Sequence, residues 1–250
     1  MVICVVAAIV GLGGGVFIRP ILDAVGYHDF NNIQFLSSSA IIVMAIVSTA
    51  KRMKDGTRID MPLAILISIG AIIGGFFGDW ILDYLQDVMG SERSVQFAQT
   101  ITTMVTLSLV ILLTIKSDKR YELKSKAIPP MMGFGMGILA VFLGIGGGPF
   151  NVPMFMIFLG LTPKNATAYS LVVIFFTHTT RMVRTGFTSN FFAEYDTSVL
   201  PFVIAAAAIG GLIGAKFNKL MSDETVKKMF IASLAVVIML NLFNSLRWVV

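Results

Sequence analysis

Hydrophobic residues in this chain form long continuous runs that short polar stretches separate. The runs do not alternate with polar residues at every second position, so they predict helices and not a β-barrel. Many approach the roughly 20 residues that a helix needs to cross a bilayer. The pattern therefore predicts an all-α integral membrane protein with about 8 hydrophobic segments. We expect them at 1–25, 33–50, 62–85, 97–115, 128–159, 165–180, 198–217 and 226–244.

Two glycine-rich motifs interrupt this pattern at matching places. Gly11–Leu22 reads GLGGGVFIRPIL, and Gly144–Phe155, 133 residues later, reads GIGGGPFNVPMF. Both copies hold three consecutive glycines, then a phenylalanine and a proline. Glycine weakens a helix by about 1 kcal/mol and proline by about 3 kcal/mol, so each motif predicts a helix break within the membrane.

The segments that follow each motif also correspond. A serine-bearing span comes next, and a span with Gly74-Gly-x-x-Gly78 in the first half or Gly210-Gly-x-x-Gly214 in the second comes after it. This order predicts two tandem four-segment repeats, 1–115 and 128–250, joined by a basic cytoplasmic linker at 116–127. Each repeat would open with a glycine-broken or re-entrant helix.

Composition and charge agree with a membrane protein. The chain is 56% hydrophobic and 13% charged, whereas soluble domains carry about 25% charged residues. Its net charge of +5 comes from basic residues in loops, so it does not indicate nucleic-acid binding. One cysteine, Cys4, excludes an intramolecular disulfide and any cysteine-based metal cluster.

Loop charges bear on the orientation of the repeats. If every segment crossed the membrane, the 19 Lys and Arg residues would divide into seven and twelve. If both glycine motifs are re-entrant, they divide into five and fourteen, and the two repeats are inverted. The positive-inside rule favours this inverted arrangement.

The N-terminal segment is short. No basic region and no cleavage site accompany the apolar run after Met1, so we do not expect a signal peptide. Only ten residues precede Gly11, which is compatible with a chain that begins inside the first helix of a longer protein.

These paired motifs, with the serine-bearing and glycine-pair spans that follow them, resemble the TauE/SafE family of sulfite exporters, also called the toluene sulfonate uptake permease superfamily. The resemblance covers residues 5–246. It implies a secondary carrier in the bacterial cytoplasmic membrane that transports small sulfur-containing or organic anions. The chain departs from symmetry at Arg19, where the second copy has Val152.

The glycine triplets are the first candidates for a substrate site. A helix that begins inside the membrane directs unpaired N–H groups and a partial positive charge at whatever precedes it. Tight helix packing is the alternative, but packing motifs space their glycines about four residues apart. A dinucleotide site would need glycine at Val16 or Pro149. The candidates are Gly13, Gly14, Gly15, Gly146, Gly147 and Gly148.

Two polar residues stand next to the glycines. Arg19 could bind a sulfite or sulfonate oxyanion in a bidentate manner, or extend to the membrane surface as an interfacial arginine. Asn151 is a candidate ligand in the second motif, or else a cap for free backbone groups.

Hydroxyl groups and one histidine complete the candidate set. Ser37, Ser39 and Ser170 could donate hydrogen bonds to an anion, or bond back to their own helix. His178 could relay the proton that drives a secondary carrier, or lie at the membrane interface near the end of its span.

Secondary anion transport by alternating access around the two motifs is the function that these features favour. A passive anion channel of the same fold is the alternative. No catalytic set is visible, so we do not expect an enzyme. The expected partners are a small anion and the lipid bilayer, with a homodimer left open and no nucleic acid, cofactor or metal.

Overall fold

The computed structural model describes residues 1–17, 21, 30–90, 92–116, 127–143, 147–188 and 197–249, and every element in these residues is an α-helix. Arg19 and Gly146 lie outside the described residues. The helices are α1 (Val2–Val10), α3 (Phe30–Lys54), α4 (Met61–Met89), α5 (Glu92–Ile115), α6 (Ile128–Phe142), α7 (Gly148–Phe158), α8 (Pro163–Thr188), α10 (Leu200–Leu220) and α11 (Asp223–Val249).

Several of these helices are suited to a bilayer. Among the described residues, five helices are long and apolar enough to cross a membrane: α3, α4, α5, α10 and α11. Helices α6 and α7 are apolar but have 15 and 11 residues, fewer than the roughly 20 that a span needs. Large apolar side chains cover the outside, including Trp80, Phe202 and Met239, which are 64%, 77% and 72% exposed. Such a surface suits lipid and not water, so the prediction of an all-α membrane protein is confirmed.

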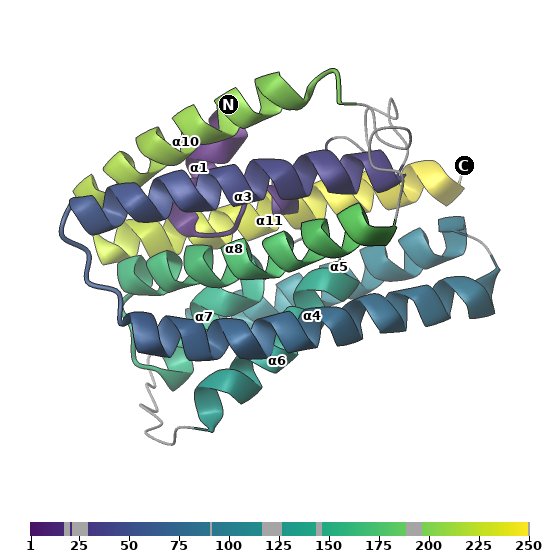
Figure 1. Cartoon of the computed structure of the whole chain (residues 1–250), viewed down its shortest axis with the longest axis horizontal. Helices are drawn as coiled ribbons and strands as arrows, with labels where there is room; N and C mark the ends of the chain where they lie inside the picture. The colour runs from purple at the N-terminus through teal and green to yellow at the C-terminus, as the bar shows by residue number, and fades with distance from the viewer. Residues whose placement is uncertain are drawn as a thin grey trace.

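The helices pack around a central pair. Helices α3 and α8 lie side by side in the middle of the bundle, with α1 and α10 on one side and α4 and α6 on the other (Figure 1). Helix α5 packs against α11. The buried core runs through this arrangement and includes Met44 of α3, Leu171 of α8 and Phe155 of α7.

Glycines bring α4 and α6 into backbone contact. A Cβ on Gly70 or Gly74 would overlap the carbonyl of Pro130 or Phe134. At Gly78 a Cβ would lie 2.7 Å from the carbonyl oxygen of Ile138. The prediction that the Gly74–Gly78 motif permits close helix approach is therefore confirmed, since only glycine fits at these positions.

The glycine pair of α10 makes the equivalent contact with α1. A Cβ on Gly210 would lie 2.5 Å from Cβ of Cys4, and one on Gly214 would lie 2.6 Å from Cβ of Ala8. These two contacts make α1 parallel to α10. Helix α6 is parallel to α4 for the same reason. Its residues Pro130, Phe134 and Ile138 contact α4 glycines in the same order along both helices.

Helices α1 and α6 run in opposite directions through the bundle. The start of α4 and the end of α10 lie at the same end of the molecule, where Thr57 and Lys219 line one cleft. Helix α1 therefore runs toward that end, and α6 runs away from it. Helix α7 then returns, because α8 starts at that end as well (Figure 1).

The end of α3 differs from the sequence-based expectation. The span predicted at 33–50 continues as helix to Lys54, because the stop signal is Gly56 with φ of 95°. The Thr57 N–H donates to the Arg52 carbonyl at 3.0 Å, and the Gly56 N–H donates to the Met53 carbonyl at 3.1 Å. A glycine with positive φ ends many helices in this way. The expected basic loop from Lys51 was therefore wrong for its first four residues.

The span that contains His178 is also longer than expected. The span was predicted at 165–180, but α8 continues to Thr188. His178 therefore lies well inside the helix and not near its end.

Candidate functional site

The two glycine motifs meet in the structure. Gly148, in the second motif, packs against the backbone of Leu12 in the first so closely that a Cβ would overlap the Leu12 carbonyl. Both residues are buried. Segments 136 residues apart in sequence therefore form one backbone contact in the interior.

The first motif ends α1 and breaks the helix, as predicted. Gly11 is the left-handed C-cap of α1 with φ of 70°, and Gly13 has φ of 72°. A Cβ on Gly13 would lie 3.4 Å from Ile174 of α8 and 3.6 Å from Ile41 of α3. The break thus lies against the two central helices. Gly14 and Gly15 follow and are buried, and the Phe17 N–H donates to the Gly14 carbonyl at 3.1 Å.

A buried arginine satisfies the carbonyl groups that the break leaves free. The Arg52 side chain is 3% exposed, and its Nη2 donates to the carbonyls of Ala8 at 2.5 Å and Ile9 at 3.4 Å. Its Nη1 donates to Thr167 Oγ1 at 2.9 Å and Asn218 Oδ1 at 3.0 Å. A cation at a helix C-terminus also stabilises the helix dipole. Arg52 therefore acts as an external cap for α1.

Asn218 of α10 completes this cap. Its Nδ2 donates to the Ile9 carbonyl at 2.6 Å, so α3 and α10 both hold the end of α1. No carboxylate pairs with Arg52 among the residues that the structure describes. Sequence reasoning missed both residues. The position of Gly56 could have identified Arg52. Because α3 ends only just before this glycine, Arg52 lies within the helix and is buried.

The candidate serines differ in what they bind. Ser170 is fully buried, and its Oγ donates to the Gly11 carbonyl at 2.7 Å, so it binds the first break directly. The Ser39 Oγ donates to the Phe35 carbonyl of its own helix at 2.9 Å. Ser37 is 4% exposed, and it lies 133 residues before Ser170, the same interval that separates the two motifs.

The second motif starts α7. Gly147 is the N-cap, Gly148 is the first helical residue and Pro149 occupies the first turn, where its missing N–H and fixed φ are tolerated. The last turn of α6 is held by a neutral group: Gln99 Nε2 donates to the Phe142 carbonyl at 2.6 Å.

Asn151 is the most unusual residue of this motif. It is fully buried, and neither Oδ1 nor Nδ2 has a hydrogen-bond partner among the residues that the structure describes. The side chain points back to the start of α7, because a Cβ on Gly147 would lie 2.9 Å from its Oδ1 and 3.1 Å from its Nδ2. An unpaired buried polar group costs about 1–3 kcal/mol. The amide is therefore free to bind a ligand at the helix N-terminus.

His178 joins the two central helices. Its Nδ1 lies 3.1 Å from Ser38 Oγ, and the two side chains are 6% and 3% exposed. Which of the two atoms donates depends on the histidine tautomer. The alternative in which His178 lies at an interface does not agree with its burial inside the bundle.

The structure thus brings part of the predicted set together. Gly13, Gly14, Gly15, Gly147, Gly148, Asn151 and Ser170 lie at the two breaks. Ser39 bonds to its own helix, and Arg19 and Gly146 fall outside the described residues. In the described residues no group of three or more His, Cys, Asp or Glu side chains is arranged to hold a metal ion.

Broken helices that meet inside an apolar bundle are typical of membrane transporters. Comparison with known families agrees: the model of the family described as "Sulfite exporter TauE/SafE" matches residues 1–241. The chain belongs to this family, as its motifs predicted.

Curated relatives carry transporter names. The chain is 24% identical over 245 residues to "Probable membrane transporter protein YunE" of Bacillus subtilis, covering 88% of this chain and 86% of the relative. It is 20% identical to "Probable membrane transporter protein YdhB" of the same organism, covering 96% of each chain. A "Probable membrane transporter protein" of Haemophilus influenzae is 24% identical, covering 95% of this chain and 92% of the relative. No solved structure matches significantly. The protein is therefore a multi-pass membrane transporter.

Proposed function

We propose that this protein is a secondary carrier for small sulfur-containing or organic anions, such as sulfite or sulfonates. One observation carries the proposal: Asn151 is buried and unpaired at the N-terminus of α7, where this helix meets the first glycine motif. The family description, which names sulfite export, supports the choice of substrate class.

Electrostatics at this point favour an anion. The N-terminus of α7 carries a partial positive charge, and the Asn151 Nδ2 can donate two hydrogen bonds. Gly147 has no side chain at the start of α7, so a small oxyanion that binds the Asn151 amide could also approach the backbone there. Arg52 adds a full positive charge at the first motif, which Gly148 contacts through Leu12. Polar amides and dipoles hold an anion in a membrane at lower cost than a lysine in the site.

We further propose that residues 1–115 and 128–250 are inverted repeats that exchange access between the two membrane sides. Reciprocal contacts support this: α1 packs on α10 as α6 packs on α4, and α1 and α6 run in opposite directions. Ile41 and Ile174, 133 residues apart, both contact Gly13. The basic connections would face the cytoplasm under the positive-inside rule, in a bacterial inner membrane.

The coupling ion in this proposal is the proton, carried by His178. A histidine that is buried between the two central helices, with one serine hydroxyl as partner, can exchange a proton when the helices separate. We expect His178→Gln to abolish uptake driven by a pH gradient while anion exchange continues. Loss of exchange together with driven uptake would show that His178 has a structural role instead.

Flux in proteoliposomes tests the whole proposal. Purified protein should move radiolabelled sulfite, sulfoacetate, taurine or sulfate and should show counterflow, which a passive channel does not. Gly147→Leu and Gly14→Leu should abolish flux while the protein stays in the membrane. Wild-type rates in both variants would contradict a site at the glycine motifs, and flux without counterflow would identify a channel.

A further inference from the structure

A polar cleft opens at the end of the bundle where three connections meet. It has a volume of about 260 Å³ and lies between the α3–α4, α7–α8 and α10–α11 connections. Three cationic side chains line it, Arg52, Lys164 and Lys219, together with two carboxylates, Asp55 and Asp223. Its position is distinct from the glycine motifs, although Arg52 extends from the cleft to the carbonyls at the end of α1, just before the first motif.

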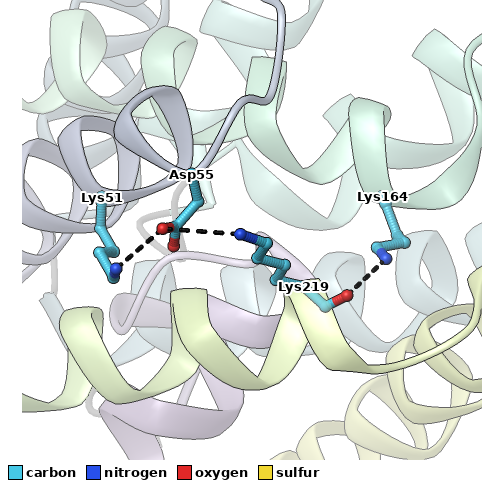
Figure 2. A network of polar contacts seen from close by, with 4 residues as sticks. All are labelled: Lys51, Asp55, Lys164 and Lys219. Atoms are coloured by element: carbon cyan, nitrogen blue, oxygen red, sulfur yellow. Dashed lines mark hydrogen bonds and ion pairs between the residues drawn. The ribbon is translucent and has the colours of Figure 1, made fainter.

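The cations of the cleft are incompletely neutralised. Asp55 Oδ1 lies 2.9 Å from Lys51 Nζ and 3.7 Å from Lys219 Nζ, so one carboxylate serves two lysines (Figure 2). Lys164 Nζ donates to the carbonyls of Lys219 at 3.0 Å and Met221 at 2.9 Å, which are neutral acceptors. Three cations, Arg52, Lys164 and Lys219, thus face two carboxylates, Asp55 and Asp223, which leaves one excess positive charge in the cleft.

The floor of the cleft is the cap of the first break. Arg52 and Asn218 line the cleft and also bind the last carbonyls of α1. Thr167, which accepts from Arg52, lies one helical turn before Ser170, which binds Gly11. Side chains in contact therefore connect the cleft to the motif that meets Gly148.

We propose that this cleft is a second anion site, an outer vestibule that receives small oxyanions on the basic side of the membrane before they reach the glycine motifs. The inference rests on the proposed transport of anions. A volume of about 260 Å³ accommodates a tetrahedral oxyanion with several waters, at about 30 Å³ each. Lysines attract such an anion as mobile point charges, and Arg52 separates it from the inner site.

Within the protein, the Asp55 carboxylate competes with an incoming anion for the lysine side chains at the cleft. Its hydrogen bond to Lys51, together with the charge of Lys219, lowers the pKa of its carboxyl group. The group is therefore ionised at neutral pH and holds two lysines that an incoming anion would use. Removing its charge should strengthen anion binding, whereas removing a lysine should weaken it.

Calorimetric titration of sulfite into the full chain in lipid nanodiscs tests this site. The background variant Asn151→Leu, or Asn151→Ala if leucine is not accommodated, silences the inner site. In that background we expect Lys219→Gln and Lys164→Gln each to weaken sulfite binding about tenfold. Asp55→Asn should strengthen it about tenfold by the same reasoning. Lys54→Gln removes an exposed charge from the same helix end, outside the cleft, and should change binding less than about twofold.

Two results would overturn the vestibule. One is complete loss of sulfite binding in the inner-site variant, and the other is an equal loss in Lys54→Gln and Lys219→Gln, which would indicate a general surface potential. If the transport proposal is wrong but the vestibule exists, the experiments give a different result. Wild-type protein would then move none of the tested anions, while the opposite effects of Asp55→Asn and Lys219→Gln on binding persist.

Discussion

The two glycine breaks have similar sequences but different surroundings. At the first, Arg52, Asn218 and Ser170 bind the carbonyls of Ala8, Ile9 and Gly11, so side chains from three helices hold the break. At the second, Gln99 binds the Phe142 carbonyl, and the Asn151 side chain has no hydrogen-bond partner in the described part of the chain.

This difference indicates that the two breaks have different roles. The first break is held by a charged cap, and its polar groups are occupied by protein. The second break keeps a buried amide unpaired at considerable cost, which protein structures tolerate where a ligand binds. Sequence symmetry between the motifs therefore does not imply equal roles: in the proposed mechanism the first motif supports the site, and the second would bind the substrate.

The largest effect should follow from separating the two breaks. Gly148→Ala places a Cβ on the Leu12 carbonyl, where only backbone movement can relieve the overlap. Overpacking costs about 1–3 kcal/mol and occasionally more, and an overlap with backbone lies at the upper end, so we expect little folded protein and no transport, measured by detergent size exclusion and flux.

Gly147→Ala is the matched control. The atoms nearest to its Cβ would be those of the Asn151 side-chain amide, with Oδ1 at 2.9 Å and Nδ2 at 3.1 Å. We expect normal folding and transport reduced by about tenfold, because one displaced hydrogen-bond donor is worth about 1.4 kcal/mol. Equal folding defects in both variants would contradict the assigned contacts.

Removing the caps should affect the first break more than the second. Arg52→Met deletes hydrogen bonds to two α1 carbonyls and a favourable charge at the helix end, for an expected loss of about 2–4 kcal/mol. Gln99→Met deletes the bond to the Phe142 carbonyl, for about 1 kcal/mol. Thermal unfolding in one detergent compares them. A larger loss for Gln99→Met would reverse the proposed roles.

The smallest effect concerns the serines. Ser170→Ala removes a hydrogen bond between α8 and Gly11 and should cost about 1 kcal/mol. Ser39→Ala removes a bond within α3 and should be nearly neutral. Unfolding temperatures of the two variants, measured side by side, distinguish a bond across the break from a bond within one helix. Equal unfolding temperatures for the two variants would show that the Ser170 hydrogen bond does not stabilise the first break.

Much of the fold could be predicted from the sequence. Hydrophobic runs located every described helix, and the glycine-rich motif that starts at Gly11 predicted the end of α1, because glycine readily adopts the φ of 70° found there. The motif Gly74–Gly78 predicted close helix contact for the same lack of a side chain. These features depend on local chemistry that the sequence contains.

Contacts between distant segments could not be predicted in this way. Arg52 was assigned to a loop because a charged residue beside a span usually faces water. Its burial depends on Asn218 and Thr167, which are 166 and 115 residues away. Asn151 was a candidate from its position beside the glycines, but its lack of a partner depends on the packing around α7.

The unpaired amide of Asn151 forms the proposed substrate site, and Asn151→Leu removes that amide. Leucine has the same branched side-chain shape and no polar atoms, so it should raise the unfolding temperature, because an unsatisfied amide costs about 1–3 kcal/mol. Counterflow of sulfite in proteoliposomes, measured on the same preparation, should fall about a hundredfold, since each 1.4 kcal/mol of lost binding is tenfold. A more stable protein without counterflow is the predicted result. A destabilised protein, or one that exchanges sulfite at the wild-type rate, would contradict it.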